Sequence, residues 1–110
     1  MIEEKEYRGL VDKAFRVIEN AFDSIDPDIA EGSLSQGAVT ILFSNGNRCI
    51  LSTQPSVRQI WLAAAAEGIA HHFDFDLKTG HWIDDKGKGV ELLAYVRDLV
   101  AKTSGVQLSL

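Results

Sequence analysis

The residues best suited to chemistry are five carboxylates gathered in residues 19–31, a window with no lysine or arginine. Their summed charge equals the formal net charge of −5 of the whole 110-residue chain, so the acidity is local. Carboxylate oxygens suit hard cations such as Fe²⁺, Fe³⁺, Mn²⁺ and Ca²⁺. Because no His or Cys stands among them, we expect such binding to be weak and unselective. The five are Glu19, Asp23, Asp26, Asp28 and Glu31.

The same acidic window has two other interpretations. A row of exposed carboxylates is a complementary surface for a basic protein partner. It can also be an ordinary solvated face with no function. The negative net charge argues against nucleic acid as the main partner.

Other reactive side chains are few. His71 and His72, beside Asp74 and Asp76, could form a transition-metal site. Adjacent residues of a strand face opposite ways, however, so a solvated polar strand end is the preferred interpretation. Cys49 has no base next to it in the sequence, and we expect it to pack as a small hydrophobe.

Conventional catalysis finds little support, since the chain has no Gly-rich phosphate loop, nucleophile elbow or zinc signature. A role without enzymatic chemistry is therefore favoured, and enzymatic activity stays an open alternative.

Length and composition limit the class of protein. The 110 residues, with 45% hydrophobic and 25% charged residues, predict a single domain over 1–110. No apolar run reaches the ~18 residues of a membrane span, and the first residues are not a signal peptide. A single cysteine suits a reducing compartment. The expected location is the cytoplasm, with no membrane association.

Hydrophobic periodicity predicts the elements that position these residues. Apolar spacing of three and four predicts helices over 4–25 and 90–102, the second closed by Gly105. Between them, alternation predicts short strands over 29–35, 38–44, 47–53, 73–77 and 81–84. Asn45-Gly46 predicts a hairpin with a type I′ turn. The last residues, Val106 to Leu110, are expected to cover an open edge of the core.

The central strand lies within Gln54–Ala64, after a proline turn. Ile60 and Leu62 point to one face, while Gln59 and Trp61 point to the other. This strand alone leaves open whether Trp61 is a surface anchor or part of the core. Trp82 is expected to be buried, where it can meet Phe73 or Phe75 across a hairpin.

The order of elements predicts the architecture. A run of strands flanked by two helices, without βαβ alternation, indicates the α+β class: a two-layer sandwich in which both helices cover one face of an antiparallel sheet of five to six strands. Such a sheet exposes its second face, so Trp61 is expected on the exposed side.

Two strings in the chain are specific when they occur together. QPSVRQIWLA begins at Gln54, and HFDFDLKTGHWIDDKGKGVELLAYV begins at His72. With them, nearly the whole chain resembles the frataxin family, and more closely its bacterial branch. The resemblance implies the frataxin-like fold, which agrees with the architecture expected from periodicity.

The resemblance also implies a function. Frataxins carry an acidic ridge on the first helix and first strand, associated with weak iron binding and with docking to the cysteine desulfurase of iron–sulfur cluster assembly. By this resemblance, the protein would be an iron-binding accessory protein that regulates the desulfurase and docks on the desulfurase–scaffold complex. Whether it inhibits or activates is open. A ferroxidase or iron-storage protein and a metal-independent interaction module are the alternatives, and the expected state is a monomer, with iron-dependent oligomers left open.

The resemblance assigns residues to both surfaces. Glu19, Asp23, Asp26, Asp28 and Glu31 match the ridge, which is sparser here than in typical bacterial members. Gln54, Gln59 and Trp61 match the family's exposed sheet residues and are expected to bind the partner. Two positions depart from the family pattern: Ser52 stands where an asparagine is usual, and Asp74 where a histidine is usual.

Overall fold

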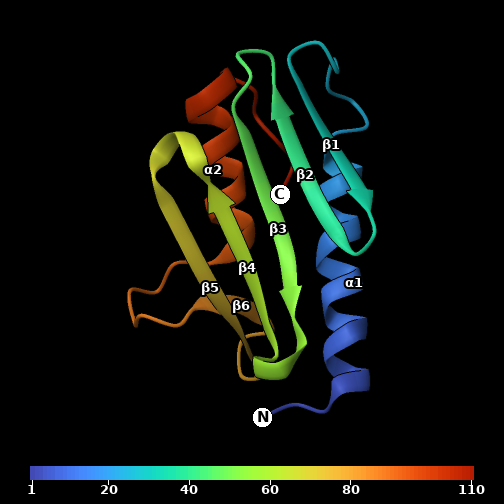
Figure 1. The fold of residues 1–110 in the computed structure, drawn as a ribbon, viewed down its shortest axis with the longest axis vertical. Helices are drawn as coiled ribbons and strands as arrows, with labels where there is room; N and C mark the ends of the chain where they lie inside the picture. Colours follow the sequence, from blue (N-terminus) through green and yellow to red (C-terminus); the bar gives the residue numbers. More distant parts are fainter.

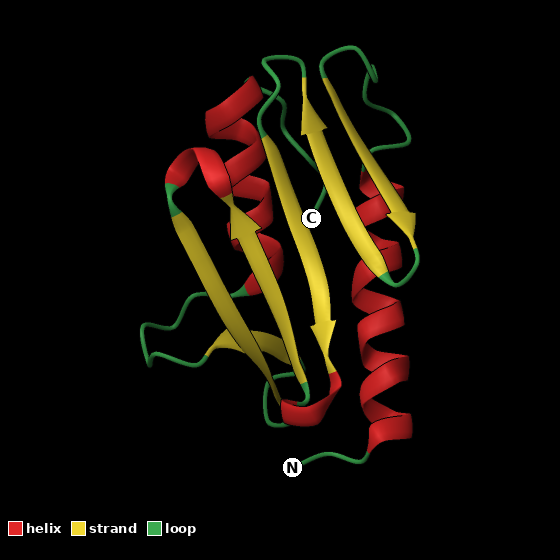
Figure 2. Ribbon diagram, viewed as in Figure 1, coloured by secondary structure: helices red, strands yellow, loops and turns green.

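In the computed structural model, which describes residues 1–110, two helices cover one face of a six-stranded antiparallel sheet (Figures 1 and 2). The strands follow the sheet in chain order, so every neighbouring pair is joined by a short connection. This confirms the predicted α+β sandwich. The helices are α1 (Glu4–Ala21) and α2 (Leu92–Ser104), and the strands are β1 (Ala30–Ser35), β2 (Ala38–Phe43), β3 (Arg48–Gln54), β4 (Gln59–Ala64), β5 (Ile69–Asp76) and β6 (His81–Asp84).

The core lies between the helices and the inner face of the sheet. In β4, Ile60 and Leu62 are fully buried, while Trp61 points to the opposite, outer face, as the alternation predicts. Trp82 is only 5% exposed and lies in the core, as expected. The C-terminal tail returns toward this layer between the two helices in Figure 1, and Leu108 is buried there. Neither helix combines the length and apolar character needed to span a membrane.

The first helix is shorter than the predicted 4–25, because the chain leaves the helix after Ala21. The N–H groups of Phe22 and Asp23 bond to carbonyls three residues back, which tightens the last turn. The Phe22 ring then packs on Gly32 of β1, where an added Cβ would lie 2.5 Å from the ring. Gly32 is therefore needed for this close contact, and the prediction that Asp23 shares a helix face with Glu19 is wrong.

The hairpin between β2 and β3 forms where it was predicted, but with another turn. Only Gly46 has a positive φ, of 88°, whereas a type I′ turn would require one at Asn45 as well. The Gly46 N–H donates to the Phe43 carbonyl, and the Phe43 N–H donates to that of Asn47. The connection is thus a three-residue loop with glycine in the left-handed position.

Three boundaries in the second half differ from the predictions. Strand β5 begins at Ile69, well before the predicted residue 73, and Leu77 lies beyond its end with 69% of its surface exposed. Helix α2 runs from Leu92 to Ser104, slightly later than predicted. Its start is set by Glu91, whose carboxylate accepts bonds from the next backbone N–H groups in the helix, a role usually taken by Asp, Ser or Thr. Gly105 ends it in the left-handed conformation, as predicted.

Candidate functional site

The five carboxylates of the acidic window follow the chain from the end of α1, around the connecting loop, into β1 (Figure 1). Four of them are exposed, and none of these four forms an ion pair with a lysine, arginine or histidine. They form a negatively charged strip, called here the acidic edge. Its members are Asp23, Asp26, Asp28 and Glu31.

Glu19 differs from the other four. It is half-buried, and its Oε2 accepts a hydrogen bond from the Leu34 N–H at 3.0 Å. Because Leu34 lies in β1, this bond joins the last turn of α1 to the edge of the sheet. The sequence indicated a charge on a helix face but could not show this bond. Glu19 thus has a structural contact in addition to any part in a charged surface.

The acidic edge is extended. No three His, Cys, Asp or Glu side chains in the chain converge into a group that could hold a metal ion. The one internal contact is local: Asp26 Oδ1 accepts the Asp28 N–H at 2.9 Å, which shapes the loop. An open row of carboxylates suits weak, exchangeable cation binding or a basic protein surface better than a tight chelating site.

The outer face of the sheet carries the second candidate surface, around Trp61. The indole N–H donates to Gln59 Oε1 at 2.9 Å, and the ring lies flat against His72 of β5, with centroids 4.2 Å apart and planes 12° apart. Gln59 Nε2 in turn donates to the carboxylates of Asp74, at 3.1 Å, and Asp85, at 3.0 Å. Of these residues, the sequence predicted Gln59 and Trp61 but not the stacking role of His72.

Tyr7 fixes the start of this surface from the helix layer. Its hydroxyl donates to the Gln59 carbonyl and accepts the Gln54 N–H at 3.1 Å. Burial raises the pKa of Tyr7, so it remains a neutral donor. Gln54 and Gln59 pair across β3 and β4, and both are half-buried. The sequence placed Tyr7 on the apolar face of the first helix but gave no sign of this double hydrogen bond.

Both surfaces belong to a chain that matches a known protein family. Residues 1–106 match the frataxin-like domain. The chain belongs to the frataxin family. Among its relatives, the iron-sulfur cluster assembly protein CyaY of Tolumonas auensis is 38% identical over 109 residues, 99% of each chain. The protein of the same name from Pseudomonas fluorescens Pf-5 is 40% identical over 85 residues, 77% of this chain and 74% of that one.

Solved frataxins share the fold. Frataxin from Psychromonas ingrahamii superposes with a TM-score of 0.85 at 25% identity, covering 97% of this chain and 96% of that one. A ferrous complex of trimeric frataxin from Saccharomyces cerevisiae has a TM-score of 0.63 at 24% identity, over 96% and 89% of the two chains. The second likeness concerns the fold alone.

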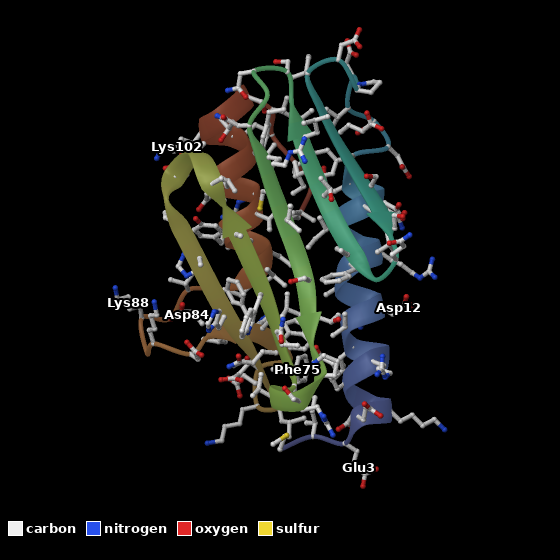
Figure 3. The ribbon with its side chains drawn as sticks, in the orientation of Figure 1. Glu3, Asp12, Phe75, Asp84, Lys88 and Lys102 are labelled. Atoms are coloured by element: carbon white, nitrogen blue, oxygen red, sulfur yellow. The ribbon has the colours of Figure 1, made fainter.

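Two histidines of this frataxin-like chain were expected at a solvated strand end, and that expectation is wrong. His71 and His72 lie within β5 and point to opposite faces. On the inner face, His71 Nδ1 lies 3.0 Å from Oδ2 of Asp84, and its ring meets Tyr95 edge-on at 4.6 Å. The hydrogen bond from His71 is the main reason that the pKa of Asp84 lies below its usual range. Asp84 stands at the end of β6, before the loop that carries Lys88 (Figure 3).

The one cysteine of this frataxin-like chain is buried. Cys49 is completely buried in the inner face, as its expected role as a small hydrophobe requires. Burial raises its pKa to about 12, so the thiol does not ionise at neutral pH. Redox or nucleophilic chemistry at this cysteine has no support.

Proposed function

We propose that this protein acts in iron–sulfur cluster assembly, as an accessory protein that binds iron weakly and regulates a cysteine desulfurase. The observation that carries the proposal is the acidic edge, a strip of four exposed carboxylates without cationic partners. It lies in a chain of the frataxin family whose relatives include proteins named for iron–sulfur cluster assembly.

The acidic edge would serve both iron and the partner. On such an open surface each Fe²⁺ or Fe³⁺ ion would be held by few carboxylate ligands. The iron would therefore remain exchangeable and act as cargo. The same negative strip attracts basic surfaces of the desulfurase over roughly a Debye length of about 8–10 Å. Regulation would follow from docking, since the acidic edge and the outer sheet face supply charge and contact surface, and the buried Cys49 thiol does not supply a nucleophile. The cytoplasm is the proposed location.

The outer sheet face would supply the second contact, toward the desulfurase–scaffold complex. Gln59 and Trp61 present polar and aromatic surface side by side, and an indole of this kind is a common interface anchor. Gln54 lies opposite Gln59 on β3 and extends the same surface. Together the acidic edge and this face would orient the protein on its partners.

The test combines two measurements on the intact protein. Anaerobic calorimetry with Fe²⁺ measures metal binding, and turnover of the cysteine desulfurase of the same organism is measured with and without the protein at two iron concentrations. We expect weak Fe²⁺ binding and a change in turnover, in either direction, that depends on iron. Metal binding without any effect on turnover would favour an iron store or ferroxidase instead, and docking without metal binding would favour a plain interaction module.

A matched pair of variants assigns the effect to the acidic edge. Asp23→Asn with Asp28→Asn removes two exposed charges there, and Glu3→Gln with Glu6→Gln removes two exposed charges at the start of the chain. The first pair should weaken both iron binding and the turnover effect, while the second should leave both unchanged. Sedimentation at increasing iron would show whether the protein remains a monomer.

A further inference from the structure

Exposed apolar side chains gather at one end of the molecule, the end where the chain begins (Figure 1). Of the seven large apolar side chains that are exposed, three lie at this end: Met1 at 92%, Leu77 at 69% and Val57 at 46%. Met1 lines a shallow hollow with Leu77 on one side and another with Val57 on the other, so the three form one surface. Apolar surface concentrated in this way is typical of an interaction site.

One of these hollows is an open groove of about 420 Å³, called here the N-terminal groove. Phe75 anchors it to the core, because its ring packs on Trp82, and both residues are labelled or placed near the N-terminus by the strands that carry them (Figure 3). The N-terminal segment is held in place by Arg58, whose Nε donates to the Ile2 carbonyl at 3.1 Å. A closed cavity of about 150 Å³ can hold a benzene ring, so this groove has room for an aliphatic side chain. The residues that line it are Met1, Ile2, Glu3, Glu6, Phe75 and Leu77.

Leu77 stands at the rim of the N-terminal groove, on a turn that is fixed by hydrogen bonds. The Asp76 carboxylate accepts from the Lys78 N–H and from the Thr79 hydroxyl, both at 3.0 Å, and the Asp76 carbonyl accepts from the Gly80 N–H at 2.8 Å. The sequence predicted Leu77 at the end of a strand, yet it lies beyond the strand with most of its surface exposed. Because the turn is already ordered, covering this leucine costs little conformational entropy.

The charges beside Leu77 and those of the groove have opposite signs. Lys78, next to Leu77, is exposed and forms no ion pair. Glu3 and Glu6 line the groove, are exposed and have no cationic partner either. One surface thus combines a projecting leucine beside a positive charge with a groove beside negative charges, and these two parts are complementary. A two-fold axis between two molecules would bring each part against its complement, as an isologous contact requires.

We propose that this end of the molecule pairs with the same end of a second copy of this chain. In the pair, Leu77 of each copy enters the N-terminal groove of the other, and Lys78 of each copy lies against Glu3 and Glu6 of the other. The inference goes beyond the proposed function and does not depend on it, because neither iron nor the acidic edge takes part. Each copy supplies one side chain and one open groove, so the contact is small and the dimer is weak.

The first test removes the apolar contact. Sedimentation velocity of the iron-free protein, from micromolar to millimolar concentration, gives the dissociation constant of the dimer for the wild type, Leu77→Ser and Leu42→Ser. Leu42→Ser is the matched control, because Leu42 is an exposed leucine on the outer face of β2. We expect the wild type to dimerise, Leu77→Ser to weaken the dimer about tenfold or more, and Leu42→Ser to change it less than about twofold. A wild type that stays monomeric at millimolar concentration overturns the proposal, as does a dimer that Leu77→Ser leaves unchanged.

The second test uses the symmetry of the contact. Lys78→Glu places like charges against Glu3 and Glu6, and the double variant Glu3→Lys with Glu6→Lys places like charges against Lys78. Each variant alone should therefore dimerise about tenfold more weakly than the wild type. In an equimolar mixture of the two variants, both contacts of a mixed pair regain opposite charges, so the dimer should return. If the mixture does not associate, or if neither variant alone weakens the dimer, these residues do not face each other and the proposal fails.

Circular dichroism melts show whether the variants fold. All the substituted positions are exposed, so we expect melting temperatures close to that of the wild type. If Leu77→Ser does not fold, the mixture of the two charge variants decides the matter. These experiments contain neither iron nor desulfurase, so their failure leaves the proposed function standing, and failure of the proposed function leaves the dimer standing.

Discussion

At the scale of single residues, the two tryptophans differ in their burial and in the side chains that they contact. Trp82 is buried and forms T-shaped contacts with Phe75, with ring centroids 5.3 Å apart, and with Tyr7, at 6.1 Å. Trp61 is half-buried and has one aromatic neighbour, His72, which lies against one face of its ring. Trp82 therefore contributes mainly to folding, and Trp61 is available for binding.

This contrast gives the first prediction. Trp82→Ala should lower the free energy of unfolding by about 3–5 kcal/mol, because it leaves a cavity in the core. Trp61→Ala should cost only about 1 kcal/mol, from the lost stacking on His72, while weakening partner binding by about 1–3 kcal/mol. Urea unfolding of both variants, followed by partner titration of Trp61→Ala, makes the comparison. Equal losses of stability would contradict the assignment of one indole to the core and one to a binding surface.

Glu19 gives the second prediction, because its carboxylate satisfies a backbone N–H of β1. Glu19→Ala leaves the Leu34 N–H without its acceptor and should cost about 1–2 kcal/mol of stability. Glu19→Gln keeps an acceptor and should cost less. Asp23→Ala, at an exposed neighbouring carboxylate, should stay within about 0.5 kcal/mol of the wild type. If the unfolding free energies of Glu19→Ala and Asp23→Ala coincide, the Glu19 contact has no energetic weight.

At the scale of elements, β5, β6 and the loop before α2 are joined by one buried carboxylate, that of Asp84. Asp84 is 4% exposed, and its two oxygens accept from His71 Nδ1, at 3.0 Å, and from the Lys86 N–H, at 2.8 Å. The Asp84 N–H donates to the Val90 carbonyl just before α2. One aspartate thus connects two strands to the start of the second helix.

This connection predicts a defined dependence on pH. Because the pKa of Asp84 is lowered in the folded protein, the unfolded chain takes up a proton at that site first as the pH falls. The stability from the ionised carboxylate is complete above the unfolded pKa of about 3.9 and is lost as the pH falls through the lower, folded value. Asp84→Asn should cost about 1–3 kcal/mol at pH 7, and that difference from the wild type should shrink in acid.

Urea unfolding at pH 7 and near pH 3 measures this difference. Asp98→Asn, at an exposed carboxylate of α2, is the matched control and should differ little from the wild type at either pH. A difference between Asp84→Asn and wild type that stays constant over this range would mean that the Asp84 charge does not stabilise the fold.

Hydrophobic periodicity and the order of the segments were sufficient to predict the helices and strands. The end of the first helix and the type of turn in the hairpin were not predicted correctly. Alternation placed Trp61 and Ile60 on opposite faces, because side-chain direction in a strand is local. The end of α1 could not be read in the same way: Phe22 continues the helical spacing, and its packing on Gly32 of β1 is visible only in the fold. Asn45-Gly46 permits two hairpin loops, and the sequence does not choose between them.

The candidate site shows the same division. Composition alone indicated the acidic edge, because like charges gathered in one window need no partner to be recognised. The hydrogen bond from the Leu34 N–H to Glu19, 15 positions away, and the pairing of His71 with Asp84, 13 positions away, depend on the folded register. The sequence predicts that these polar side chains are solvated, because no neighbouring residue in the chain indicates a partner for them.

At the scale of the whole molecule, the negative charge is concentrated along one edge. The last turn of α1 contains no basic residue, and the exposed carboxylates of the acidic edge follow it without a cation. Like charges at this spacing repel one another, and negative charge near a helix C-terminus is unfavourable. The folded protein therefore tolerates a small electrostatic cost on this edge, and the proposed binding function would account for it.

The last prediction reverses that charge. Asp23→Lys, Asp26→Lys and Asp28→Lys each add two positive charges, which together take the formal net charge from −5 to +1. Relief of repulsion should preserve the stability or raise it by a few tenths of a kcal/mol per site. The gain is small because charges at exposed positions are screened and because the Asp28 N–H loses its Asp26 acceptor. Affinity for both iron and the desulfurase should fall. Wild-type binding to the desulfurase should also weaken steeply as salt is added.

A control with the same net charge makes the result specific to the acidic edge. Glu3→Lys, Glu6→Lys and Asp98→Lys change three exposed carboxylates elsewhere and also give a formal net charge of +1. Calorimetry with Fe²⁺ and with the desulfurase, beside thermal melts of both triple variants, compares location at constant charge. Equal losses of affinity would mean that net charge alone governs binding. Unchanged affinity in the Asp23, Asp26 and Asp28 variant would mean that the acidic edge is only a solvated surface, and the proposed function would lose its main support.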